Sequence, residues 1–320
     1  MVVTDAFNDV DDVVALYALS KSAVRCAGIV TTYGNERTRA KAVSKFLRMA
    51  DVQNVPVYYS KVWESRFQAP NDMNETGYGF LSESELLAGN KHSGINSGGE
   101  KFIADSINSD AGGISVLSIA PLTALAHAMR SVKPQNCGRI YVMGGHIGAY
   151  DNTPNTAYNH AQIPEYNFTC DPAAVKNVLA SGAEVFVVGK NLWTKDLFSL
   201  EDFGFLEIGT PVQRELFRMI KLRHEHNKKI FSPRGIDAEV FMYDPITLGA
   251  VLFPELYEFR RMDVEVDDTG VTHATFSERG NIQGAVGADL AQIKKKAVKH
   301  HWRIIGHLRL RLSMILGFIW

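Results

Sequence analysis

The chain has 320 residues, of which 46% are hydrophobic and 22% are charged, proportions close to those of ordinary globular proteins. Its formal net charge of -1 gives the molecule no general attraction to nucleic acid or to an anionic membrane. The three cysteines form no C-x-x-C pair, so we expect no structural zinc site. No apolar run reaches the roughly 18 residues of a membrane span, and the first residues do not resemble a signal peptide, so we expect a cytoplasmic protein.

Short β-branched segments alternate with stretches of helical periodicity as far as Val188. The predicted strands are Val2–Thr4, Gly28–Thr32, Val55–Tyr59, Ile114–Ile119, Arg139–Met143 and Val185–Val188. The predicted helices are Val10–Ser20, Arg37–Met49, Pro121–Arg130 and Pro172–Ser181. Alternation of this kind is typical of βαβ units on a parallel sheet. We therefore predict an α/β fold with a single open, mostly parallel sheet flanked by helices, with loop and helical insertions.

Residues 60–98 and 144–170 are rich in turn-forming residues and are predicted to be loops. Both follow predicted strands, and in open α/β sheets the carboxyl ends of the strands carry the ligand site. Residues 200–250 have helical character, and Met262–Phe276 alternates like a β-hairpin.

The last segment of the chain differs in composition from the rest. Residues 294–320 are first basic and then almost wholly apolar, which favours a helical tail that packs on the domain or on a partner subunit. The apolar part is too short to span a bilayer. We therefore divide the chain into one domain over residues 1–293 and a tail over residues 294–320.

An acidic segment, Thr4–Asp12 (TDAFNDVDD), joins the first predicted strand to the first helix. It has no glycine and four carboxylates, which excludes a pyrophosphate-binding turn. Two like charges about 4 Å apart repel by roughly 4 kcal/mol at an effective dielectric of about 20, so these groups point apart, take up protons or share a cation. A helix N-terminus stabilises one or two acids, but Asp5 is still at the strand end. We predict that Asp5 and Asp12 bind a metal, with oxygen ligands favouring Ca²⁺ or Mg²⁺ over zinc.

The acidic loop and six further motifs, in the same order, resemble those of the inosine–uridine-type nucleoside hydrolases. The loop is similar to a longer TDAxNxxDD variant of that family's DxDPGxDD opening. The further matches are Thr31–Asn35 with T-x-x-G-N, Val55–Tyr58 with P-V-Y, Ile119–Thr123 with G-P-L-T, Met143–Gly145 with M-G-G, Asn159–Pro172 with N-x5-E-F-N-x3-D-P, and Tyr243–Pro245 with H-D-P. The resemblance covers all but the tail. It implies hydrolysis of ribonucleosides to ribose and free base, as in nucleoside catabolism.

The same resemblance assigns roles to individual residues. It implies a Ca²⁺ held by Asp5, Asp12, Asp244 and the backbone carbonyl of Ile119. The residues that it implies for ribose binding are Asp11, Asn35, Asn159, Glu165 and Asn167. Considered without the resemblance, Asn35 and Asn159 are equally consistent with ordinary loop asparagines. We expect Glu165 and Asn167 to face the same side of an extended segment.

The implied mechanism makes Asp5 the general base that takes a proton from a Ca²⁺-bound water. Tyr243 stands where the family often has a histidine beside the leaving base, and a phenol with a pKa near 10 is a poorer proton donor at neutral pH than an imidazole near 6.5. Tyr243 is therefore a candidate contact to the leaving base. Tyr78, Phe80 and Trp193 could stack on the base, although aromatic residues in loops more often pack locally. A ribonucleoside- or sugar-binding protein with lost turnover is the alternative. The resemblance also implies a homo-oligomer, either a dimer or a tetramer.

Overall fold

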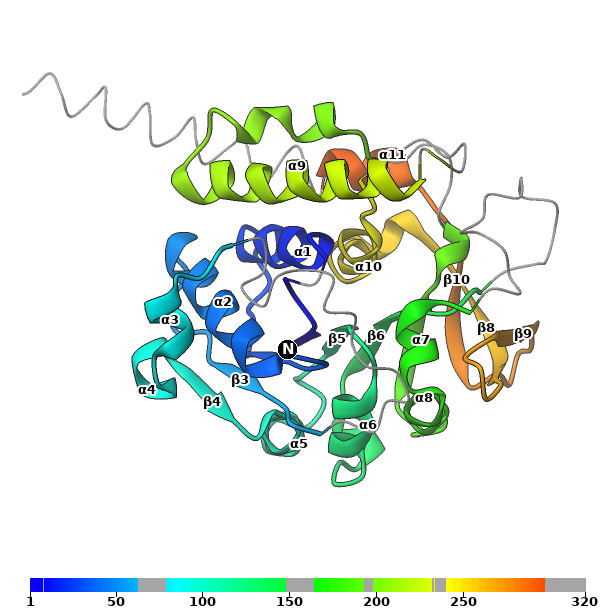
Figure 1. Ribbon diagram of the computed structural model, residues 1–320. Coiled ribbons are helices and arrows are strands. Elements are labelled where there is room, and N and C mark those ends of the chain that lie inside the picture. Colours follow the sequence, from blue (N-terminus) through cyan, green and yellow to red (C-terminus); the bar gives the residue numbers. More distant parts are fainter. Residues whose placement is uncertain are drawn as a thin grey trace, which may run out of the picture.

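The computed structural model describes residues 1–7, 9–62, 79–147, 164–192, 198–231, 233 and 240–296. Within these residues the strands form one ten-stranded sheet of order β4-β3-β2-β1-β5-β6-β7-β10-β8-β9 (Figure 1). The strands are β1 (Val2–Thr4), β2 (Ile29–Thr31), β3 (Val57–Tyr59), β4 (Ile95–Ser97), β5 (Val116–Ile119), β6 (Arg139–Met143), β7 (Glu184–Val188), β8 (Tyr257–Val266), β9 (Thr272–Phe276) and β10 (Ile282–Ala288). Neighbours from β4 to β10 are parallel, and β8 pairs antiparallel with β10 and β9. The predicted single, mostly parallel sheet is thus confirmed.

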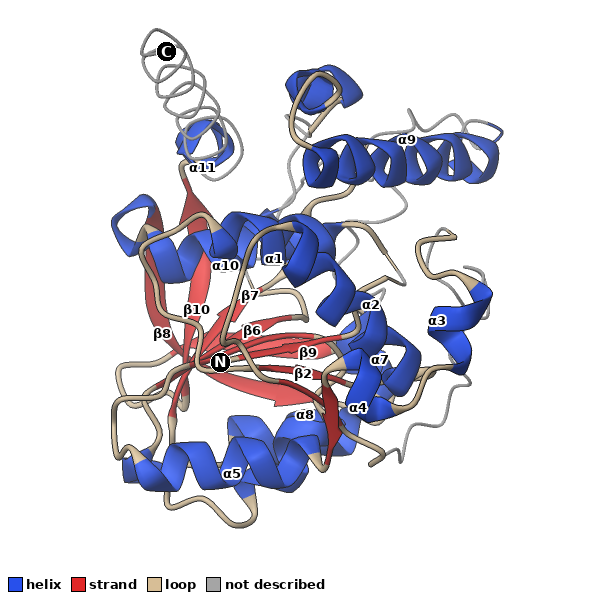
Figure 2. Ribbon diagram, turned by 90° about the vertical axis from the view of Figure 1, so that its left-hand side faces the viewer, coloured by secondary structure: helices blue, strands red, loops and turns tan. Residues whose placement is uncertain are grey.

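Helices cover both faces of the sheet (Figure 2). The α-helices are α1 (Asp11–Ser20), α2 (Glu36–Met49), α3 (Glu83–Leu87), α4 (Asn90–Ser93), α5 (Gly99–Ser109), α6 (Thr123–Met129), α7 (Tyr166–Cys170), α8 (Pro172–Leu179), α9 (Pro211–Phe231), α10 (Tyr243–Leu252) and α11 (Leu290–Ile293). Helices α1, α2 and α10 pack on one face, and α5, α6 and α8 pack on the other. Helix α9 lies outside α1 and α10 (Figure 1). Among the described residues, no helix combines the length and the apolar character needed to cross a membrane.

The period-two alternation of a strand explains the two cores. On β1, Val2 belongs to the apolar cluster under α1 and α10, whereas its neighbour Val3 belongs to the cluster under α5 and α6. Both side chains are buried, because helices cover both faces of a parallel sheet. Since all the central strands run in the same direction, their carboxyl ends, and the loops that follow them, meet at one edge.

Some elements differ from the sequence-based expectation. Helix α5 and strands β4 and β10 were not predicted, and the presumed loop over residues 60–98 contains the short helices α3 and α4. Strand β10 has a glycine at position 284 for a steric reason, because a Cβ there would lie 2.3 Å from the side chain of Ile147. The hairpin expected at Met262–Phe276 is confirmed as β8 and β9. Residues 297–320 of the predicted tail lie outside the described residues.

Candidate active site

Three aspartates from opposite ends of the chain meet at the carboxyl edge of the sheet. Asp11 and Asp12 are in the first turn of α1, and Asp244 is in the first turn of α10, which packs beside α1. Each offers a carboxylate oxygen, and these atoms all lie within 4.8 Å of one another. All three residues are buried, and the main-chain N–H of Asp244 donates to Asp11 at 3.4 Å. Both helix N-termini thus point their partial positive charge at the same acidic cluster.

The environment of this cluster disfavours the charged forms of its acids. Burial, and then the charges of neighbouring aspartates, raise the pKa of Asp11, Asp12 and Asp244 well above the ordinary value. Burial also raises the pKa of Asp5 to about 6, although the nearby Arg39 opposes this rise. Carboxylates brought together in this way either hold protons or share a cation. The donor atoms are all oxygen, so the described residues can hold a hard divalent cation.

The group of three differs in composition from the metal-ligand set that the resemblance implied. It includes Asp11, which the resemblance assigned to ribose, and it does not include Asp5. Asp5 is nevertheless buried beside this group. It lies close enough for its charge to contribute to the raised pKa of Asp12 and of Asp244. Ile119 is the last residue of β5 and pairs with Thr4 of β1, which directly precedes Asp5. The structure therefore brings all these residues to one place.

Glu165 and Asn167 lie at the end of β6, on α7, and both are buried. The expectation of an extended segment was wrong here. Glu165 is the N-cap of α7, and its carboxylate accepts hydrogen bonds from the main-chain N–H groups of Asn167 (2.9 Å), Phe168 (3.1 Å) and Gly145 (3.2 Å). Burial raises the pKa of Glu165 to about 7. The Asn167 side chain donates to the carbonyl of Met143 at 3.2 Å.

Helix α7 reaches the residues that follow β2, the strand beside β1 and its acidic loop. The hydroxyl of Tyr166, between Glu165 and Asn167, lies 3.1 Å from the hydroxyl of Tyr33, which follows β2. Burial raises the pKa of Tyr166, and the charge of Asp5 contributes to this rise. The predicted ribose-binding pair and the acidic cluster thus border a common site.

The remaining predicted residues occupy several environments. Asn35 is exposed at the N-terminus of α2, and Tyr243 is half-buried at the N-terminus of α10. Asn159 lies outside the described residues. Phe80 is buried in the core, where its ring stacks on that of Phe7 with the centroids 5.1 Å apart. This packing shows that Phe80 is a core residue, which agrees with the local packing expected more often of loop aromatics. Tyr78 and Trp193 lie outside the described residues.

Two arginines near the acids were not identified from the sequence. Arg223 of α9 forms an ion pair with Asp9 at 2.6 Å, so α9 brings a positive charge to the acidic loop. Arg39 of α2 is buried and donates to main-chain carbonyls of the acidic loop. The sequence pattern does indicate that Arg39 is buried, because it shares a helical face with the apolar residues Val43 and Phe46.

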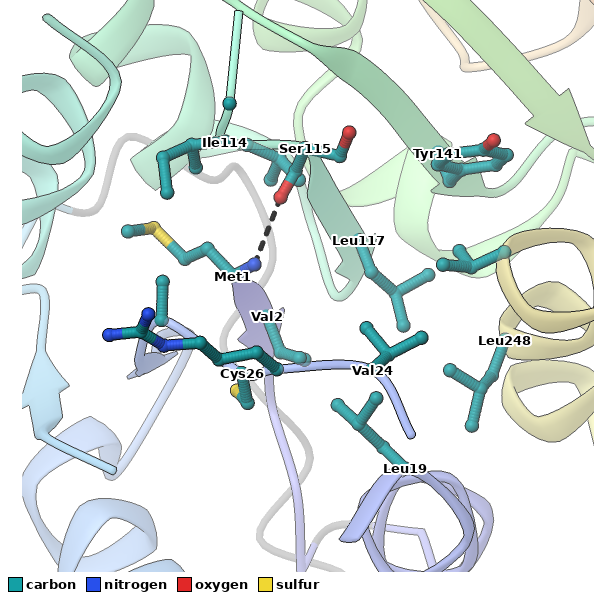
Figure 3. Close-up of a pocket in the computed structure, with 15 residues that line it drawn as sticks. Met1, Val2, Leu19, Val24, Cys26, Ile114, Ser115, Leu117, Tyr141 and Leu248 are labelled. Atoms are coloured by element: carbon teal, nitrogen blue, oxygen red, sulfur yellow. Dashed lines mark hydrogen bonds between the residues drawn. The ribbon is translucent and has the colours of Figure 1, made fainter. Parts of the chain in front are cut away.

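A separate cavity of about 230 Å³ lies at the opposite edge of the sheet (Figure 3). It opens between the amino ends of β1 and β5, the end of α1 and the side of α10, and its lining is mostly apolar. The main-chain amine of Met1 donates to the carbonyl of Ser115 at its wall, at 2.9 Å. None of the predicted site residues lines this cavity, so it is not the candidate active site.

The chain matches one protein family and several known proteins. The family model described as inosine-uridine preferring nucleoside hydrolase matches residues 2–300. The chain is 28% identical over 280 residues to "Probable uridine nucleosidase 2" of Oryza sativa subsp. japonica, covering 84% of this chain and 79% of that protein. It is 26% identical over 266 residues to "Pyrimidine-specific ribonucleoside hydrolase RihB" of Escherichia coli O1:K1 / APEC, covering 80% of each.

Two solved structures share the fold. The first, "Plant nucleoside hydrolase - PpNRh1 enzyme", superposes with a TM-score of 0.74 at 19% identity, covering 94% of this chain and 98% of the other. The second, a purine-preferring ribonucleoside hydrolase from Gardnerella vaginalis, has a TM-score of 0.76 at 18% identity, covering 93% and 96%. The match of the family model over nearly the whole chain shows the family to which the chain belongs. The chain belongs to the inosine–uridine preferring nucleoside hydrolase family, whose members hydrolyse the N-glycosidic bond of ribonucleosides.

Proposed function

We propose that this protein releases ribose from ribonucleosides with Asp5 as the general base, beside a Ca²⁺ held by Asp5, Asp12, Asp244 and the carbonyl of Ile119. The observation that carries the proposal is the buried group of carboxylate oxygens of Asp11, Asp12 and Asp244, which lie within 4.8 Å of one another, with the buried Asp5 beside it. When bound, the cation would orient a water molecule and make its proton easier to remove. Burial raises the pKa of Asp5 to about 6 in the metal-free protein, and a bound cation would lower it, so Asp5 would be ionised at neutral pH and able to accept that proton.

Ribose recognition falls to the polar residues around the cluster. Vicinal hydroxyls need acceptors for their O–H groups and donors for their oxygens, which carboxylates and amides supply. Asp11 shares the acidic group with Asp12, so a hydroxyl that Asp11 binds lies beside the cation site. We assign the other ribose contacts to Asn35, Asn159, Glu165 and Asn167. Contacts that strengthen as the ribosyl group gains oxocarbenium character lower the barrier.

Tyr243 is our candidate for the residue that contacts the leaving base. Tyr243 sits one residue before Asp244, at the start of α10, and is half-buried. Its ring is nearly parallel to that of Phe241, with the centroids 6.4 Å apart. We propose that its hydroxyl donates a hydrogen bond to the departing base, without full proton transfer.

The direct test measures ribose release from purine and pyrimidine ribonucleosides, with Ca²⁺ and with a chelator. We expect turnover with Ca²⁺ and its loss with the chelator. In Asp5→Asn, kcat should fall by about 100-fold or more, the usual contribution of a general base. The control is Asp105→Asn, which changes an exposed aspartate of α5 and should leave kcat unchanged.

Two outcomes would contradict the proposal. Near-normal turnover of Asp5→Asn would exclude this residue as the base. Thermal stabilisation by a ribonucleoside without any ribose release would instead favour the alternative, a ribonucleoside-binding protein on the same scaffold.

A further inference from the structure

Arg39 connects two loops of the site through one buried guanidinium group. The side chain comes from α2 and is only 8% exposed, although it always carries a positive charge. Its Nε donates to the carbonyl of Tyr33 at 2.8 Å, and its Nη1 donates to the carbonyls of Asp5 and of Ala6, the latter at 3.0 Å. Tyr33 follows β2, whereas Asp5 and Ala6 follow β1. One side chain therefore fixes the carboxyl ends of two neighbouring strands relative to each other.

The backbone at both contacts has an unfavourable conformation. Tyr33 has a φ of 63° and Phe7 has a φ of 73°, both in the left-handed region that bulky residues rarely adopt. Such conformations persist only where the surrounding structure holds them. Arg39 bonds the carbonyl of Tyr33 itself and that of Ala6, directly before Phe7. These hydrogen bonds explain how the strained backbone is held.

The position of Arg39 also accounts for how its own charge is tolerated. A buried cation is costly unless hydrogen bonds and opposite charges compensate it. The three carbonyls supply the hydrogen bonds, and the carboxylates of Asp5 and Asp12 lie close enough for Arg39 to oppose the rise of their pKa. The planar guanidinium supplies several donors in fixed directions, which a lysine does not.

We propose that Arg39 is a positioning residue: by holding the carbonyls of Asp5, Ala6 and Tyr33 together, it aims the Asp5 carboxylate at the reacting water. The inference rests on the proposed function, in which Asp5 is the base. In this role Arg39 acts through the main chain of the acidic loop and not through a contact with the substrate. A misplacement of about 1 Å at a catalytic group can reduce the rate by about 100-fold.

The test uses the full chain with Arg39→Met, Arg39→Lys and the matched control Arg37→Met. Arg37 is on the same helix but is exposed, and its side chain bonds Asn90. We expect kcat to fall by about 100-fold in Arg39→Met and by at least about tenfold in Arg39→Lys, because lysine keeps the charge but not the donor geometry. KM should change much less than kcat, and Arg37→Met should match the wild type.

Two measurements on the protein without substrate distinguish a positioning role of Arg39 from a purely electrostatic role. In the metal-free protein, hydrogen–deuterium exchange over residues 4–7 and 31–35 should increase in both Arg39 variants and not in Arg37→Met. Calorimetric titration with Ca²⁺ should show weaker binding to Arg39→Met. A purely electrostatic role predicts the opposite, since removal of a positive charge beside the acids would tighten Ca²⁺ binding.

Each result decides the inference. It is overturned if Arg39→Lys, or a folded Arg39→Met, shows the kcat and the exchange of the control, or if Arg39→Met binds Ca²⁺ more tightly. If Arg39→Met does not fold, the lysine variant gives the answer alone. If the wild type releases no ribose, the proposed function fails, and exchange and Ca²⁺ affinity still test whether Arg39 positions the loop.

Discussion

Burial changes the acid–base behaviour of Glu165 more than its hydrogen bonds can offset. Its carboxylate accepts three main-chain N–H groups, which favour the ionised form, and the charge of Lys190 acts in the same direction. Burial has the larger effect and raises the pKa to about 7 from an ordinary value of 4.5. The folded protein therefore binds this proton more tightly than the unfolded chain does.

The sign of the resulting pH dependence follows from linkage. A carboxyl whose pKa is raised by folding contributes stability that is fully present below its unfolded pKa and is lost as the pH rises through its folded pKa. For Glu165 this loss falls between about pH 4.5 and about pH 7. Glutamine resembles the protonated form and does not titrate, so the part of the pH dependence that comes from this group should disappear.

We therefore predict that Glu165→Gln reduces the fall in melting temperature between about pH 5 and about pH 8. The measurement is thermal unfolding in the presence of a chelator, with the exposed Glu184→Gln as control. The same variant should raise KM, because an acceptor for a ribose hydroxyl is lost. An unchanged slope of melting temperature against pH would contradict the assignment of this titration to Glu165.

At the scale of elements, the junction of β6 and α7 determines where Glu165 and Asn167 stand. The ring of Phe168 packs directly against the glycine turn that ends β6: a Cβ on Gly144 would lie 2.1 Å from it. Gly145 has a φ of +67°, a conformation that favours glycine. Small residues in this turn allow α7 to lie close to the sheet.

We predict that Gly144→Ala displaces α7 and so disturbs the predicted ribose contacts. Overpacking of this kind costs about 1–3 kcal/mol of unfolding free energy. KM for the nucleoside should rise in parallel, as measured by ribose release. Gly204→Ala provides the control, because a Cβ there would meet nothing within 4 Å. If Gly144→Ala kept the stability and the KM of this control, the junction would not set the position of α7.

For the whole molecule, the acidic group joins parts of the chain that are far apart in sequence. Asp11 and Asp12 are near the first residue, whereas Asp244 belongs to α10. A cation bound by this group binds the folded protein and not the unfolded chain, so it stabilises the fold by mass action. Because its carboxyl ligands must lose their protons, the stabilisation should increase with pH.

We predict that Ca²⁺ at about 100 times its dissociation constant raises the free energy of unfolding by about 2.7 kcal/mol near neutral pH. The gain should be smaller near pH 5 and should be reversed by a chelator. Calorimetric melting with and without Ca²⁺ measures it, and Asp244→Asn should abolish most of it. A melting temperature that does not respond to Ca²⁺ at any pH would contradict a calcium site in this group.

The sequence by itself determined the features that depend on local patterns. The β-branched runs at Val2–Thr4 and Arg139–Met143 became strands with those same bounds, because their apolar content suits strands covered on both faces. The proline at the start of α8 and the N-cap carboxylate of Asp171, which accepts from the N–H of Ala174 at 2.9 Å, follow from capping preferences. The charge density of the acidic loop was also sufficient to predict carboxylates that could hold a cation.

Only the tertiary structure decided which side chains share an environment. That Asp11 rather than Asp5 groups with Asp12 and Asp244 depends on how α1 packs against α10, which no local pattern encodes. The burial of Arg39 and its contacts with two loops depend in the same way on the order of strands in the sheet. Periodicity fixes the face on which a residue lies, whereas the distance between two faces is set by packing between segments remote in sequence.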